Sequence, residues 1–199
     1  MKKFLNLVMH HWYLYVIALL MGVFVINYSI DLINKPRNEE TITLFIACSE
    51  SGSSIELRKK LNEEKPSYLR EINIFTVDQN SKDYDRYFTI YGIDNSDIVI
   101  LPKNKIEDEV VTNYYASFEK EYIEEYVSPS SYYVSENNGL MYGIKVHSIG
   151  EENALINYRN DGFDEDYYAF FIKKSKHIGK LYQSEYVTAF NFINIIKNN

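Results

Sequence analysis

The sequence predicts an α/β fold, with one α/β domain following a single apolar helix at the N-terminus. Apolar, β-branched runs at Thr41–Cys48, Glu71–Asp78 and Asp97–Leu101 are typical of buried strands. A helical pattern over residues 53–65 separates the first two of these runs. Strands that alternate with helices in this way indicate a mainly parallel sheet, to which a hairpin is added later in the chain.

The first element is the uncharged stretch Trp12–Ile30, which is 19 residues long. A helix of this length spans roughly 28 Å, at ~1.5 Å rise per residue. The hydrocarbon core of a bilayer is about 30 Å thick, and a helix satisfies its own backbone hydrogen bonds there. The sequence therefore predicts one transmembrane helix and a single-pass topology.

A cleaved secretory signal is the alternative to a permanent anchor. Lys2 and Lys3 give the charged start that a signal also has. The apolar stretch is longer than the 7–15 residues typical of signals, and no small-x-small cleavage site follows it. Trp12 and Tyr28 lie near its two ends, as in the aromatic belts of membrane helices. We expect an uncleaved anchor.

The expected layout has three parts. Residues 1–33 form a cytoplasmic tip and the transmembrane helix, residues 34–40 a polar linker, and residues 41–199 an extracytoplasmic α/β domain. The positive charge before the helix slightly exceeds the charge after it, which favours a cytoplasmic N-terminus. We therefore expect a cell-membrane protein whose C-terminal domain lies outside the cytoplasm.

A lipid-anchored cysteine does not fit the sequence. Ala47-Cys48 resembles the end of a lipobox, but Phe45 stands where an aliphatic residue is needed. The polar residues 34–41 also separate this site from the apolar helix. Cys48 is the chain's one cysteine, so no internal disulfide can form, and its place in an apolar strand predicts a buried, unreactive thiol.

The composition of residues 41–199 bounds the possible partners. This stretch holds 17 Lys and Arg against 25 Asp and Glu, a net charge of −8. Its 159 residues suffice for one domain with a proper core. Because the sequence contains no basic stripe, nucleic acid is not an expected partner. The same acidity gives no reason to expect binding to an anionic lipid surface, beyond the bilayer contact of the helix itself.

The remaining elements follow from local signals. Ser53 and Glu56 form a capping box that opens the helix before Pro66. Asn138-Gly139 is a strong hairpin signal. The other expected segments are helix and loop at Lys105–Tyr126, strands at Tyr132–Val134, Leu140–Val146 and Tyr167–Ile172, and a closing helix from about Ser184 to Lys197.

The candidate ligand-binding residues are Ser49, Glu50, Ser51 and Gly52. They leave the carboxyl end of the first strand and enter a helix, at the sheet edge where open α/β proteins bind ligands. Serine hydroxyls and a helix N-terminus offer hydrogen-bond donors there. The turn lacks the lysine and second glycine of a Walker loop, so an ordinary capped turn is the alternative.

No other stretch carries a chemical motif. His147 and His177 are isolated and lack the spacing of metal ligands. The acidic residues 160–166 fail as a calcium loop, because Arg159 would stand at a ligand position. No nucleophile motif is present. The sequence therefore predicts no catalytic residue, no metal and no cofactor, and a protein that is not an enzyme.

Three segments resemble the extracellular solute-binding proteins of ABC importers, which are type II periplasmic-binding proteins. Ser96–Lys105 is similar to their strand ending in Leu-Pro, Leu140–Val146 to their "YGI" hairpin strand, and Tyr167–Gly179 to the strand that follows. Thr41–Ile46 fits their first strand. The resemblance implies one receptor lobe, a small solute as ligand and an ABC permease as partner. It places ligand contacts at the turn of residues 49–52.

The chain departs from that family in two ways. The receptors have two lobes and a lipid-anchor cysteine, whereas this chain has material for one lobe and an apolar helix. A single lobe cannot close around a small molecule, and pockets normally bury most of their ligand. We expect a membrane-anchored binding module that acts with an ABC permease, another membrane protein or a second copy. The alternative is a structural or assembly protein of a membrane complex without a small-molecule ligand.

Overall fold

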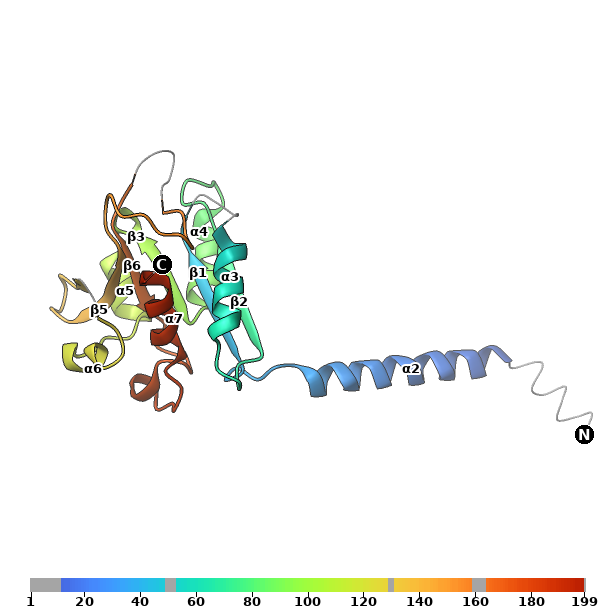
Figure 1. The fold of residues 1–199 in the computed structure, drawn as a ribbon. Helices are drawn as coiled ribbons and strands as arrows, with labels where there is room; N and C mark the ends of the chain where they lie inside the picture. Colours follow the sequence, from blue (N-terminus) through green and yellow to red (C-terminus); the bar gives the residue numbers. More distant parts are fainter. Residues whose placement is uncertain (1–11, 49–52, 129–130, 159–163, 199) are drawn as a thin grey trace, which may run out of the picture. The chain divides into compact units, whose positions relative to one another are not determined.

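The computed structural model describes residues 12–48, 53–128, 131–158 and 164–198. The chain forms two compact units, Met1–Arg37 and Asn38–Asn199. The first unit is described through its helix and the second through its sheet and covering helices (Figure 1). The predicted linker and the predicted sides of the membrane stay predictions.

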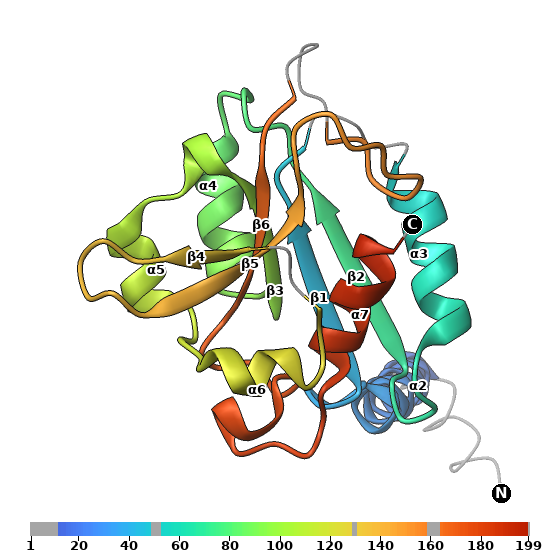
Figure 2. The ribbon, with the colours of Figure 1, turned by 60° about the vertical axis from the view of Figure 1, so that its left-hand side comes forward.

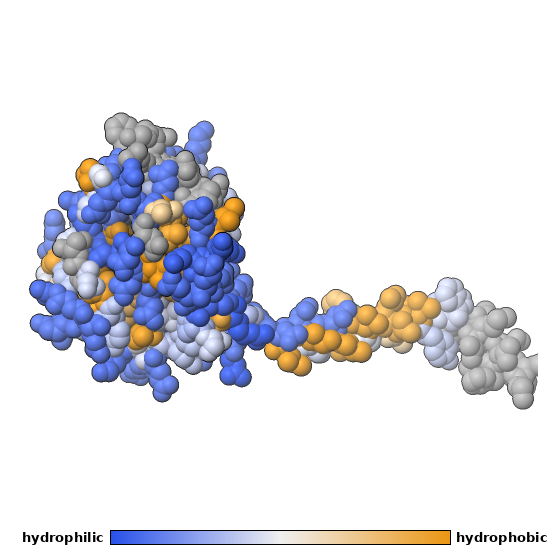
Figure 3. Space-filling view, viewed as in Figure 1, coloured by the Kyte–Doolittle hydropathy of each residue, from blue (hydrophilic) through white to orange (hydrophobic). Residues whose placement is uncertain are grey.

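The helix of the first unit is α2, which spans Trp12–Asn34. It contains every residue of the predicted stretch and continues for one more turn. All its residues are exposed, and their side chains present a largely apolar surface (Figure 3). Among the described residues it is the one helix long and apolar enough to cross a membrane.

The second unit contains six strands and several helices. The strands are β1 Thr41–Ile46, β2 Glu71–Thr76, β3 Ile98–Pro102, β4 Tyr132–Val134, β5 Met141–His147 and β6 Tyr167–Phe171. The helices are α3 Ser53–Glu64, α4 Tyr84–Tyr87, α5 Asp108–Tyr114, α6 Lys120–Glu124 and α7 Thr188–Lys197. A π-helix, η1 (Phe88–Ile93), follows α4, and 3₁₀ turns lie at Lys103–Lys105 (η2) and Gly179–Tyr182 (η3).

The strands form one open sheet in the order β2-β1-β3-β6-β5-β4. β1 is parallel to β2 and β3, as expected, but β6 is antiparallel to β3 and β5, and β4 is antiparallel to β5. The sheet is therefore mixed, and the prediction of a mainly parallel sheet is corrected. A strand buried on both faces has the same apolar pattern whichever way it runs, so the sequence could not reveal the direction of β6.

Helices cover both faces of the sheet and create two cores (Figure 2). Successive side chains of β1 point to opposite faces, so Leu44 packs into the core that contains residues of α3 and α7. Phe45 packs into the core that contains residues of α4 and α5. Leu57 and Leu61, which lie four residues apart on one face of α3, are fully buried. Two-sided burial explains why β1, β3 and β6 are apolar at successive positions.

Asp97 ties three parts of the chain together at the edge of the sheet where β1 begins. Its Oδ2 accepts a hydrogen bond of 2.8 Å from the backbone N–H of Thr43, and its Oδ1 accepts one of 2.7 Å from Ser175 Oγ. Burial raises the pKa of the Asp97 carboxyl, while these hydrogen bonds and His177 lower it, with a net rise. Asp97 is thus a half-buried polar group, and desolvation disfavours its charged form.

Replacing Ile100 by Ala tests the central position of β3. Ile100 is fully buried between β1 and β6. We expect Ile100→Ala to lower the free energy of unfolding by about 2–5 kcal/mol through lost burial and a residual cavity. Chemical denaturation measures the change. Ile55→Ala is the control, because Ile55 is 73% exposed; equal effects of the two changes would contradict the assignment.

Replacing Asp97 tests this half-buried carboxylate. Asp97→Ala leaves the Thr43 N–H and the Ser175 hydroxyl unpaired and should cost about 1–3 kcal/mol. Asp97→Asn keeps an acceptor for Thr43, and its amide can donate to Ser175 Oγ. Because the folded-state pKa is raised, the wild type should lose stability relative to Asp97→Asn as the pH rises above 3.8. Denaturation curves across pH that run parallel for the two proteins would refute the raised pKa.

Candidate functional site

Four strands end at one edge of the sheet. β1, β2 and β3 run parallel and end there, and β5 runs the same way because β6 is antiparallel to both β3 and β5. β6 begins at this edge: its first residue, Tyr167, pairs with Pro102 on one side and His147 on the other. We call this the carboxyl edge.

The strand order also reverses at this edge. The chain passes from β1 to β2 on one side and then to β3 on the other side of β1. α3 packs into one core and η1 into the other, so the two connections cover opposite faces. Such a switch point is where open α/β sheets bind ligands.

The predicted site residues Ser49, Glu50, Ser51 and Gly52 lie outside the described residues. Their flanking elements are described: β1 ends at the carboxyl edge, and α3 begins at Ser53. Cys48, the last residue before the turn, is buried as predicted. The role of the turn in binding stays a prediction.

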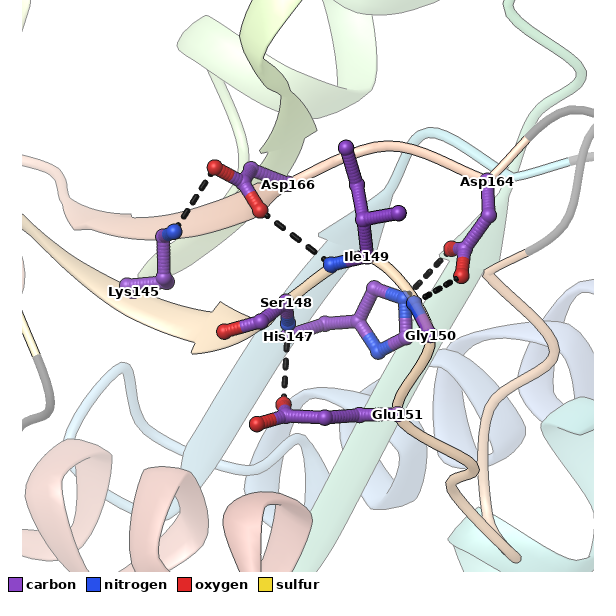
Figure 4. Close-up of polar contacts among 8 residues, drawn as sticks. All are labelled: Lys145, His147, Ser148, Ile149, Gly150, Glu151, Asp164 and Asp166. Carbon is purple, nitrogen blue, oxygen red and sulfur yellow. Dashed lines mark hydrogen bonds and ion pairs between the residues drawn. The ribbon is translucent and has the colours of Figure 1, made fainter.

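The structure adds a His–Asp pair that the sequence reasoning missed. His147 ends β5, and its Nε2 lies 2.6 Å from Asp164 Oδ1. The other carboxylate oxygen of Asp164 accepts a 2.6 Å hydrogen bond from the backbone N–H of Gly150 (Figure 4). The imidazole is only 4% exposed, so Asp164 fixes both the ring and the turn after β5.

A second carboxylate, Asp166, lies at the β6 end of the connection between β5 and β6 and also bonds to the turn after β5. Asp166 Oδ2 lies 2.7 Å from Lys145 Nζ, and Asp166 Oδ1 accepts a hydrogen bond from the N–H of Ile149 (Figure 4). Burial raises the pKa of Asp166, but the bonds from Lys145 and Ile149 outweigh it and give a net lowering. Glu151 accepts the N–H of Ser148 at 2.9 Å. The chain that joins β5 to β6 is therefore fixed at both ends by carboxylates.

Aromatic rings pack against the imidazole of His147. Its ring stacks on Tyr158 with a centroid separation of 4.4 Å, and Tyr158 lies 4.7 Å from the ring of Tyr167. Both tyrosine hydroxyls are buried, with no hydrogen-bond partner among the described residues. Burial raises the pKa of each hydroxyl, and the nearby Cys48 adds to the rise. Both tyrosines therefore stay neutral.

Two adjoining cavities open beside this cluster. They have volumes of about 230 and 400 Å³ and share His147, Glu151, Glu152 and Asn153. Tyr158 lines the smaller cavity. We call the two cavities the carboxyl-edge cleft.

Lys197, near the end of α7, lines the larger cavity. Its Nζ donates to the carbonyl oxygen of Ser128 at 2.6 Å. Burial lowers the pKa of Lys197, and Glu151 partly opposes this effect. The cleft therefore combines an imidazole, carboxylates, an ammonium group and amides beside an aromatic ring.

These groups suit hydrogen-bonded recognition of a polar molecule. The described residues contain no group of three His, Cys, Asp or Glu side chains that could hold a metal ion. Asn153 is partly committed to structure, since its Nδ2 donates to Ile196 O and its Oδ1 accepts the N–H groups of Leu155 and Ile156. Glu152 is exposed and lines both cavities.

No sequence signal could have joined His147 to Asp164. The two residues are 17 positions apart, and an acidic stretch of this kind is usually a solvated loop. The antiparallel pairing of β5 with β6 places Tyr167 opposite His147, and this brings Asp164, three residues earlier, close to the imidazole. A period-two pattern reveals a strand but not its neighbour in the sheet.

Comparisons of the chain with protein-family models, with curated proteins and with solved structures found no match.

Asp166→Asn tests the carboxylate network. The folded-state pKa of Asp166 is lowered, so its contribution to stability is present above the ordinary value of 3.8 and is lost as the pH falls through the folded-state value. We expect Asp166→Asn to be less stable than wild type at pH 7, with a difference that shrinks below pH 3.8. Denaturation at both pH values measures it. Asp85→Asn, at an exposed carboxylate, is the control, and a constant difference for Asp166→Asn would argue against the network.

Proposed function

We propose that this chain is a membrane-anchored binding module that takes a small polar ligand at the carboxyl edge of its sheet. The observation that carries the proposal is the carboxyl-edge cleft, which adjoins a buried and oriented His147 at the end of β5. Oriented polar groups in a concavity at such an edge are the usual features of a ligand site.

The anchor in this proposal is α2, uncleaved and crossing a cell membrane once, with residues 38–199 outside the cytoplasm. Every described residue of α2 is exposed, so no protein core in the described part of the chain covers its apolar side chains. Hydrocarbon is the solvent that suits such a surface. The helix also exceeds the length of a signal's apolar region.

The ligand in this proposal is a sugar, a peptide or an amino acid. Glu152 and His147 offer hydrogen-bonding groups in the cleft. The resemblance to one lobe of a solute-binding protein supports the same class. A second surface would then complete the site, from an ABC permease, another membrane protein or a second copy.

The alternative is a structural or assembly protein with no small-molecule ligand. One observation favours it: the cleft is lined mainly by polar and charged residues, whereas small-molecule pockets are predominantly apolar. In that case the bonds from Asp164 and Asp166 serve only to shape a rigid surface for another protein.

A thermal-shift screen of the full chain in detergent separates the two functions. The probes are sugars, amino acids and short peptides. A ligand that binds only the folded state stabilises it and therefore raises the melting temperature. At a free ligand concentration of a hundred times the dissociation constant, the added stability is about 2.7 kcal/mol. We expect at least one probe class to do so.

Glu152→Gln locates the binding, because this change removes a charge from the cleft without breaking any hydrogen bond described above. It should reduce the shift, whereas Glu63→Gln on the exposed side of α3 should leave the shift intact. If no probe shifts the wild type, the binding function is wrong and the structural alternative stands. A shift that Glu152→Gln leaves unchanged would place the ligand elsewhere.

A further inference from the structure

The segment that includes β6 and the residues after it is positively charged, whereas the domain as a whole is acidic. Residues 167–184 contain four lysines and no Asp or Glu, although residues 41–199 carry a net charge of −8. The lysines are Lys173, Lys174, Lys176 and Lys180, and all but the half-buried Lys176 are exposed. We call residues 173–182 the basic loop. The net negative charge of the whole domain gave no reason to expect binding to anionic lipid, because a net charge does not show where the lysines are concentrated.

The fold holds the basic loop in place. Ser175 Oγ donates to Asp97 Oδ1 at 2.7 Å, and the Nε2 of the buried His177 lies 2.9 Å from the carbonyl oxygen of Thr41. Lys173 Nζ also donates to two backbone carbonyls near the end of α5. The lysines therefore belong to a loop that is tied to β1, β3 and a helix end.

These contacts place the basic loop at the amino edge of the sheet, where β1 begins. Figure 2 shows the segment that leads into α7 at this end of the domain. Thr41, the residue that His177 contacts, follows the end of α2 after six intervening residues. The chain across them reaches at most about 25 Å. With α2 in a bilayer, the start of β1 cannot lie farther than this from the end of the helix.

A cavity of about 350 Å³ lies at the same edge. Its lining includes Lys174, Lys176, Asn38, Asn95 and Tyr182. Lys176 Nζ lies 4.4 Å from the centroid of the Tyr182 ring, which is partly exposed. Ammonium groups beside an exposed tyrosine are typical of protein surfaces at the headgroup layer of a membrane.

The cavity also contains two carboxylates, and the structure limits their repulsion of an anion. Asp97 already accepts hydrogen bonds from Thr43 and Ser175, and its pKa is raised by burial. Asp94 is exposed, and Lys174 Nζ donates to its backbone carbonyl oxygen, so a positive charge lies beside this residue. Lys174 and Lys176 match these two carboxylates in number within the cavity, and Lys173 and Lys180 add positive charge elsewhere on the loop.

We propose that the basic loop binds the phosphate groups of anionic phospholipids in the membrane that α2 enters. The inference rests on the proposed anchorage by α2, but not on any ligand at the carboxyl edge. Each lysine close to an anionic membrane surface strengthens attraction by about five-fold. The contact would fix which side of the domain faces the bilayer.

Amide hydrogen exchange of the full chain in lipid nanodiscs tests the proposal. One preparation contains only zwitterionic phospholipid, and the other has one third of it replaced by an anionic phospholipid. We expect exchange at residues 173–182 to slow at least five-fold in the anionic nanodiscs. At 1 M salt the slowing should disappear, because the screening length falls to about 3 Å. Equal exchange in the two lipids overturns the proposal.

Lys176→Gln/Lys180→Gln should abolish the slowing, and it keeps the Lys173 and Lys174 contacts. Lys59→Gln/Lys82→Gln removes the same charge from two exposed positions outside the loop and should leave the slowing intact. Equal loss in both variants would mean that net charge, not the loop, attracts the lipid. That result also overturns the proposal.

Two controls identify the source of the phosphate and the state of the anchor. Glycerol phosphate added to zwitterionic nanodiscs should not slow exchange; if it does so as well as the anionic lipid, the loop binds a soluble phosphate and the lipid assignment is wrong. Protection of residues 12–34 in both preparations reports insertion of α2. An unprotected α2 contradicts the anchorage itself, whereas a protected α2 with an unresponsive loop contradicts only this inference.

Discussion

The two-sided pairing of β6 is the constraint on which the rest of the domain depends. β6 is buried along its whole length and pairs with β3 on one side and β5 on the other. Its direction sends the residues before it to the carboxyl edge and the residues after it to the amino edge. Asp164 therefore meets His147 at the first edge, while Ser175 meets Asp97 at the second.

One strand thus gives the two edges different sets of charged groups. The carboxyl edge gathers the carboxylates of Asp164, Asp166 and Glu151 around a single imidazole. The amino edge gathers lysines around a cavity that also contains the carboxylates of Asp94 and Asp97. Because backbone hydrogen bonds hold both edges in one sheet, a ligand at one edge and a membrane surface at the other would act on a rigid body.

The local signals in the sequence predicted much of the fold. The apolar runs located β1, β2 and β3, the serine and glutamate of residues 53–56 located the start of α3, and Asn138-Gly139 located the β4–β5 hairpin, where Gly139 has a φ of 70°. Segment type could not be predicted for residues 84–91, which form α4 and most of η1. Aromatic side chains there serve packing against Phe45, a contact that no local pattern encodes.

The candidate site was also predicted only in part from the sequence. The sequence pointed to the carboxyl edge, because parallel strands place their turns together, and to residues 49–52, whose part in binding stays a prediction. It treated His147 and His177 as isolated, yet each has a partner far along the chain, Asp164 and the carbonyl of Thr41. These partners depend on strand order, which a single sequence does not display.

By itself, the sequence determined an apolar helix long enough for a membrane, an acidic α/β domain and the positions of most strands. These properties follow from composition and from periods of two and 3.6 residues, which are local. Only the tertiary structure decided that β6 lies antiparallel between β3 and β5. That choice depends on which apolar faces and backbone groups satisfy one another across the sheet, and pairing between distant segments leaves no mark in the local pattern.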